Sequence, residues 1–109
     1  MLSYEVAFGM IEEIKGSSQT DLREDLLRSA IRYASVRAEF ALMSADERRE
    51  ADVSRTRLHN VFIADCDILA RAMNKAGEVC GWRERLGQER KRIGDLACWM
   101  VLIFGLGTR

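Results

Sequence analysis

Residues 96–104 read Leu96-Ala97-Cys98-Trp99-Met100-Val101-Leu102-Ile103-Phe104, an unbroken apolar run. A helix that is apolar on every side has to be surrounded by protein, either by its own domain or by a second chain. The run is too short to cross a bilayer, which takes about 20 apolar residues. We therefore expect a central helix that begins near Gln88, runs to about Phe104 and is terminated by Gly105-Leu106-Gly107, with no membrane span.

The rest of the composition predicts an all-α fold. The chain has 109 residues, contains no proline and is 48% hydrophobic and 31% charged. Absence of proline removes the strongest helix breaker, and Ala, Leu, Arg, Glu and Met are good helix formers. This length suits one domain. We expect residues 1–109 to form a single helical domain, a compact bundle of four main helices plus a short helical turn.

Helix boundaries follow from caps and glycines. The first helix should cover residues 3–15, stopped by a left-handed Gly16, and the second should start at a cap on Ser18 or Thr20 and reach Met43. Ser44 and Glu47 form a capping box for a third helix that ends at Gly77. A short helical turn at 82–86 should stop at Gly87. On the first helix the expected inward face consists of Tyr4, Ala7, Phe8, Ile11 and Ile14.

The start of the third helix is almost wholly polar. Residues 46–57 contain few apolar side chains. This segment should either project into solvent or be only partly ordered.

Four polar residues are the candidate site. Asp65 falls between Phe62 and Leu69 on the stripe expected to face inward, and a buried carboxylate needs a partner. Asp95 and Arg92 lie where the last helix turns apolar, and His59 is the only histidine. His59, Asp65, Arg92 and Asp95 are therefore the candidate members of a buried polar cluster. The simpler alternative is that each acid is tied to an arginine and only fixes the helix register.

A metal site is not expected. His59, Cys66, Cys80 and Cys98 are suitable ligand types for zinc, but they form no C-x-x-C or H-x-x-x-H pair. No pattern indicates a cofactor, and three unpaired cysteines fit core packing. The chain also lacks the charged leader and apolar run of a secretory signal. Together with the unpaired cysteines, this predicts a reducing cytoplasm.

Binding to DNA is an alternative function. Residues 82–93 loosely fit a helix-turn-helix with Gly87 at the turn, and Arg90, Lys91 and Arg92 would then be exposed on the second helix. Two features oppose it. Arg83 stands where a small residue is usual, and the recognition helix would continue directly into the apolar run. The balance of 17 basic and 17 acidic residues also lacks the excess of basic residues that is usual in nucleic-acid binders.

Two family resemblances were found. Gly94-Asp95 followed by residues 96–101 resembles the MazG-like nucleotide pyrophosphohydrolases, which hold magnesium on a Glu-x-x-Glu and a Glu-x-x-Asp. Glu47 and Glu50 provide the first pair, but Arg92 stands three residues before Asp95, where the second pair needs an acid.

A second resemblance covers about half of the chain. The residues that carry it are His59-Asn60-x-Phe62-Ile63, Leu69-Ala70-Arg71 and Trp82-Arg83-x-x-Leu86-Gly87-x-x-Arg90-Lys91-x-Ile93-Gly94-Asp95-x-Ala97-Cys98. This pattern is similar to the carboxy-terminal half of a small bacterial all-helical family of unknown function. It implies a helical fold and no catalytic role.

These observations favour a binding module over an enzyme. Apolar helix surface is abundant, and no complete set of catalytic residues is visible. If three helices cannot cover the apolar run, a second subunit should bury the rest, which predicts a homodimer. The expected function is protein interaction or small-ligand binding by a homo-oligomer, with nucleic acid as the less favoured partner.

Overall fold

The computed structural model describes residues 1–107, and this part of the chain contains five helices and no strand. The all-α prediction is confirmed, including four main helices and one short helix. The helices are α1 (Tyr4–Lys15), α2 (Thr20–Ala41), α3 (Ala45–Lys75), α4 (Trp82–Leu86) and α5 (Arg90–Gly107). No helix in the described range is long and apolar enough to cross a membrane.

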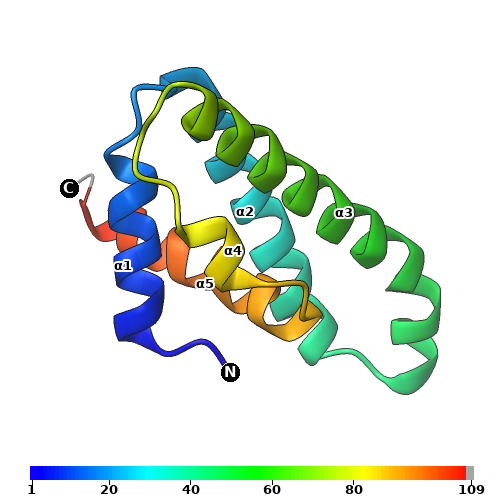
Figure 1. The fold of residues 1–109 in the computed structure, drawn as a ribbon. Coiled ribbons are helices and arrows are strands. Elements are labelled where there is room, and N and C mark those ends of the chain that lie inside the picture. Colours follow the sequence, from blue (N-terminus) through cyan, green and yellow to red (C-terminus); the bar gives the residue numbers. More distant parts are fainter. Residues whose placement is uncertain (108–109) are drawn as a thin grey trace.

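Helices α2 and α3 form an antiparallel pair that sets the length of the molecule (Figure 1). The 31 residues of α3 span about 46 Å at 1.5 Å per residue, close to the longest dimension of 47 Å. The capping box is present, since Glu47 N–H donates to Ser44 Oγ and Ser44 N–H donates to Glu47 Oε1. The polar segment 46–57 is therefore helical and largely exposed to solvent.

Two of the glycines that were predicted to end helices have a positive φ. Gly77 and Gly87 both have a φ of 73°, which an L side chain rarely adopts, and they follow α3 and α4 as expected. Gly16 is different, because its φ of −76° is right-handed and the predicted left-handed stop is wrong. The N-cap of α2 is Gln19, without a side-chain hydrogen bond, rather than Ser18 or Thr20.

Helix α5 crosses α2 and also contacts α1 and α3, so it lies at the centre of the packing. Its fully buried side chains, Ile93, Leu96, Ala97 and Met100, follow helical spacing on one face. The opposite face is not enclosed, since Leu102 is 54% exposed. Within one chain, the expectation that residues 96–104 are covered on every side is therefore wrong.

The same correction applies to α1. Ala7, Ile11 and Ile14 are buried as predicted, together with Met10. Tyr4 and Phe8 are 52% and 41% exposed. These two side chains lie one turn apart, beside the uncovered part of α5, where Tyr4 contacts Trp99.

Short helix α4 links α1 to the start of α5. Trp82 and Leu86 are fully buried. The backbone N–H groups of Gly81 and Trp82 donate to Glu13 Oε1 at 2.8 and 3.1 Å. A carboxylate that accepts the first free N–H groups of a helix satisfies donors that would otherwise be unpaired. Glu13 thus fixes the position of α4 against α1.

Candidate functional site

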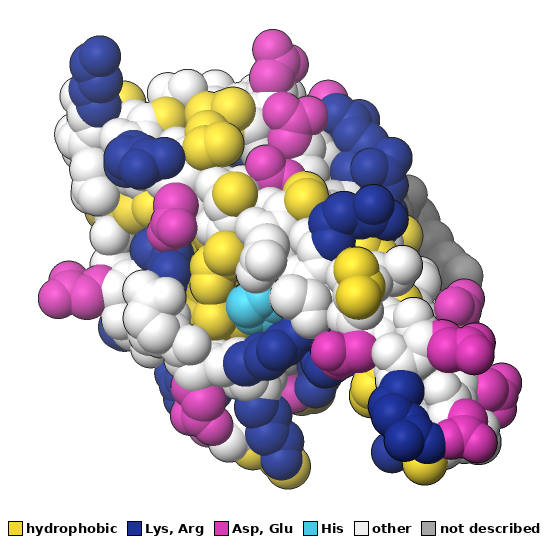
Figure 2. Space-filling view, turned by 90° about the vertical axis from the view of Figure 1, so that its right-hand side faces the viewer, with side chains coloured by type: hydrophobic (Ala, Val, Ile, Leu, Met, Phe, Trp, Pro, Cys, Tyr) yellow, Lys and Arg dark blue, Asp and Glu magenta, His cyan; other side chains and the backbone are white. Residues whose placement is uncertain are grey.

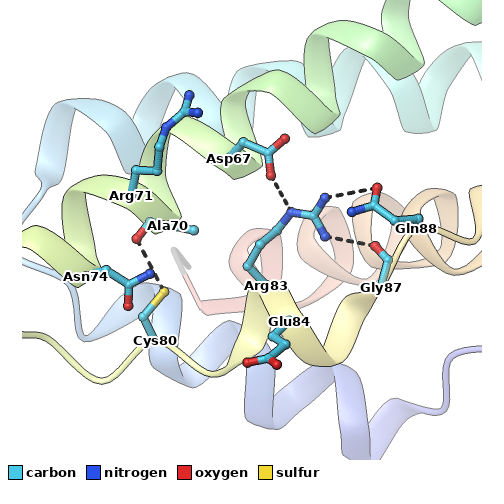
Figure 3. Close-up of a pocket in the computed structure, with 9 residues that line it drawn as sticks. All are labelled: Asp67, Ala70, Arg71, Asn74, Cys80, Arg83, Glu84, Gly87 and Gln88. Atoms are coloured by element: carbon cyan, nitrogen blue, oxygen red, sulfur yellow. Dashed lines mark hydrogen bonds and ion pairs between the residues drawn. The ribbon is translucent and has the colours of Figure 1, made fainter.

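One hollow is a polar cleft of about 470 Å³ between α3 and the segment from Cys80 to Gln88. Figure 3 shows Arg83 in its wall, pointing toward α3 and the loop that follows α4. Its Nε donates to Asp67 Oδ1 at 2.6 Å, its Nη1 to the Gly87 carbonyl at 2.8 Å, and its Nη2 to Gln88 Oε1 at 3.3 Å. Three partners and a side chain that is only 13% exposed indicate that Arg83 secures this loop.

Cys80 in the same cleft has poor nucleophilic character. Burial raises the pKa of its thiol, and the nearby charge of Glu13 raises that pKa further. The Sγ atom lies 3.6 Å from the Ala70 carbonyl oxygen, which accepts its hydrogen bond. Because the thiolate is the reactive form, this environment disfavours covalent chemistry at neutral pH.

A second hollow, of about 340 Å³, is lined by basic side chains from three helices. Its lining residues are Tyr33 and Arg37 of α2, Arg55 of α3, and Arg90 and Lys91 of α5. We call it the basic cleft. Figure 2 shows the single histidine of the chain at this face, with Lys and Arg side chains beside it.

A third hollow is apolar and lies beside the amino terminus. This groove of about 240 Å³ is lined by Met1, Leu2, Asp95, Cys98, Trp99 and Leu102. Leu2 is held on both sides, since its N–H donates to Asp95 Oδ2 and its carbonyl accepts from Trp99 Nε1, each at 3.0 Å. The first residues of the chain therefore form a fixed wall of the groove.

The four residues of the predicted polar cluster have separate partners. Asp95 binds the Leu2 N–H and lies 3.5 Å from Arg37 Nη1. Arg92 donates to the carbonyls of Leu86 and Arg85 at the end of α4. His59 packs edge-on against Tyr33, with ring centroids 5.4 Å apart, and Asp65 is half-buried. Within residues 1–107, no hydrogen bond or ion pair joins any two of these four.

The three candidate nucleic-acid residues differ in their exposure to solvent. Arg90 and Lys91 are exposed at the start of α5. Arg92 is half-buried, and its guanidinium is used by the carbonyls of α4, so the expectation that all three are exposed is wrong for Arg92. The first helix of the proposed helix-turn-helix is α4, which has only five residues.

Metal-binding groups are dispersed over the described residues. None of the His, Cys, Asp and Glu side chains there forms a group of three or more that could hold a metal ion. Glu47 is used in the capping box, and its hydrogen bonds with Ser44 lower the pKa of its carboxyl. Cys66 is fully buried, and burial strongly raises the pKa of its thiol. Cys66, Cys80 and Cys98 are all free thiols.

Comparison with known proteins gives no family for this chain. No protein-family model matches it, and neither a curated protein nor a solved structure shows significant similarity.

Sequence reasoning missed Arg37, Arg55 and Arg83. The pairing of Arg55 could have been predicted from the sequence, because it follows Asp52 at a spacing of i, i+3 on a helix. In the structure Arg55 Nη2 lies 2.6 Å from Asp52 Oδ1. Arg37 and Arg83 gave no such local signal, since their partners Asp95 and Asp67 are distant in the chain. The packing of α2 against α5 brings Arg37 to Asp95, and the packing of α4 against α3 brings Arg83 to Asp67.

Proposed function

We propose that this protein is a helical interaction module that self-associates through an apolar face formed by α1 and α5. This face, here called the α1–α5 face, consists of Met1, Tyr4, Phe8, Trp99 and Leu102. The observation that carries the proposal is the exposure of large apolar side chains on α5, the helix that contains the unbroken apolar run 96–104. Leu102 is 54% exposed there, and Tyr4 and Phe8 of the neighbouring helix α1 are also exposed.

Aromatic contacts make the face continuous. The Tyr4 ring lies edge-on to Trp99, with centroids 5.5 Å apart, and 5.8 Å from Phe8. Large apolar patches on soluble proteins typically mark interaction sites. Rigid aromatic side chains are also enriched at the centres of interfaces, where they bury much area at little entropic cost.

A second copy of the chain is the partner that fits this face. The face offers both a hollow, the apolar groove, and protruding side chains next to it, Met1 and Leu102. In a twofold interface the same patch meets itself, so a protrusion of one copy can fill the hollow of the other. The acid in the groove, Asp95, is already bound to the Leu2 N–H and to Arg37, so burying it leaves no unpaired charge.

Light scattering on the whole chain over a range of micromolar concentrations tests this proposal. The native protein should have twice the mass of the 12.4 kDa chain. Leu102→Glu should give a monomer, because it places an unpaired charge in the interface. The matched control is Val53→Glu on α3, which makes the same kind of apolar-to-acidic change at a position that is 78% exposed. This variant should remain dimeric.

A monomeric native protein at these concentrations would refute self-association. Dimers of unchanged stability in the Leu102→Glu variant would refute the α1–α5 face as the interface. Circular dichroism of both variants should match that of the native protein, because both positions are exposed.

A further inference from the structure

The basic cleft carries an excess of positive charge. Arg55 Nη2 lies 2.6 Å from Asp52 Oδ1, and Arg37 Nη1 lies 3.5 Å from Asp95 Oδ1. The other two cations of the cleft, Arg90 and Lys91, have no acidic partner within the described residues. The whole chain has as many acidic as basic residues, so this local surplus is a property of the cleft.

Two of the arginines are held in place by contacts that leave several of their N–H donors unused. The guanidinium of Arg55 lies over the Phe40 ring, with its carbon atom 4.5 Å from the ring centroid. Stacking of this kind leaves the in-plane N–H groups of an arginine free to bind an oxyanion. Arg90 is positioned by one hydrogen bond of 3.0 Å from its Nη2 to Thr56 Oγ1.

Buried polar atoms beside the cleft lack protein partners. Arg55 Nε and His59 Nε2 are buried, and neither forms a hydrogen bond with the part of the chain that the structure describes. In native proteins almost every buried polar atom is paired with protein, water or a ligand, so these two atoms can bind one of these partners. The 18-residue helix α5 begins at Arg90, and the positive end of its dipole adds to the field of the cleft.

We infer that the basic cleft binds a small phosphate compound with at least two linked phosphoryl groups. The two surplus positive charges match such a multiply charged anion, and paired arginines suit its oxygens. The volume of about 340 Å³ lies in the range of small-molecule sites. Nucleic acid is disfavoured because the cations converge on one hollow between three helices, whereas duplex binding needs an extended basic surface. This inference is independent of self-association.

Calorimetric titration of the full chain with inorganic pyrophosphate, at constant ionic strength, tests the inference. We expect saturable binding of one pyrophosphate per chain. The Arg90→Gln/Lys91→Gln variant should bind at least about tenfold more weakly, since the loss of a single charge-assisted hydrogen bond already lowers affinity by about that factor. Both residues are exposed, so this variant should fold normally.

The matched control is Lys15→Gln/Arg28→Gln. It removes the same net charge from exposed sites whose ion pairs lie elsewhere, with Glu12 and Asp25. Its affinity for pyrophosphate should equal that of the native protein. A second comparison sets Arg55→Gln against Arg49→Gln, because Arg49 pairs with Asp46 on the same helix at the same spacing. Only the Arg55 variant should bind more weakly.

Three results would overturn the inference. The first is the absence of saturable pyrophosphate binding at millimolar concentration. The second is an equal loss of affinity in the Arg90/Lys91 variant and its Lys15/Arg28 control, which would indicate a general charge effect. The third is tight binding of duplex DNA that the Arg90/Lys91 variant loses and the Lys15/Arg28 control keeps, which would make the cleft part of a nucleic-acid surface.

Discussion

The guanidinium of Arg37 lies directly against the backbone of Gly94. A Cβ atom added to Gly94 would stand 2.6 Å from Arg37 Cζ, closer than real contacts allow. This contact places Arg37 beside both Asp95 and Cys98 of α5. A glycine inside α5 is thus explained by an arginine that crosses from α2.

Gly94→Ala should have an effect that depends on Arg37. Alanine favours a helix over glycine by about 1 kcal/mol. In the native background this gain is offset, because the new methyl group displaces the guanidinium from Asp95. In an Arg37→Ala background the same substitution should stabilise the fold by about 1 kcal/mol. Urea unfolding of the native protein, the two single variants and the double variant gives the coupling free energy between Gly94 and Arg37. Equal effects of Gly94→Ala in both backgrounds would contradict the contact.

Removal of the Asp95 carboxylate should release the amino terminus. Asp95→Ala leaves the buried Leu2 N–H without an acceptor, at a cost of about 1 to 3 kcal/mol. Hydrogen exchange should accelerate at the backbone amides of residues 2 and 3 more than in the centre of α3. The control is Asp25→Ala, because Asp25 makes only an exposed pair with Arg28. Unchanged exchange at the amino terminus in the Asp95 variant would contradict this role.

Cys66 should be the last thiol to react. Burial excludes reagents from it and strongly raises its pKa, so that the thiolate is scarce at neutral pH. Cys80 and Cys98 are half-buried and should be alkylated earlier under native conditions. Mass spectrometry of peptides after timed alkylation measures the order. Equal labelling of the three cysteines in the folded protein would show that the core around Cys66 opens readily.

The helices of this chain could be predicted because their signals are local. Ser44 and Glu47 mark the start of α3, and Gly77 and Gly87 mark two helix ends, all within a few residues of the feature they determine. The prediction of a left-handed stop at Gly16 was wrong, because a glycine permits a left-handed conformation without requiring one. The apolar run also indicated buried surface, but it could not show which face of α5 the single chain leaves uncovered.

The candidate site was harder to predict because it depends on packing between distant segments. His59, Asp65, Arg92 and Asp95 were grouped by type, yet Arg92 turns back to cap α4 and Asp95 binds the start of the chain. Arg90 and Lys91 were found from the sequence. Their neighbours in the basic cleft, Arg37 and Arg55, were missed because α2 and α3 bring them there.

Glu78 should make stability depend on pH in the acidic range. Its Oε1 accepts from Ser17 Oγ at 2.7 Å and its Oε2 from the Ser18 N–H at 2.8 Å, which tie the α1–α2 loop to the end of α3. These hydrogen bonds favour the charged form and lower the pKa of Glu78 below its ordinary value of 4.5. Because the folded pKa is lowered, the stabilisation is fully present above pH 4.5 and is lost as pH falls through the lowered pKa.

Glu78→Gln tests this linkage, because an amide has only one oxygen for two donors. The variant should be less stable than the native protein at neutral pH, and the difference should shrink as the pH is lowered through the titration of Glu78. Chemical unfolding at a series of pH values measures it. Glu24→Gln, an exposed change on α2, should give a small difference that does not vary with pH. A difference at Glu78 that stays constant down to strongly acidic pH would mean that the carboxylate charge does not stabilise the loop.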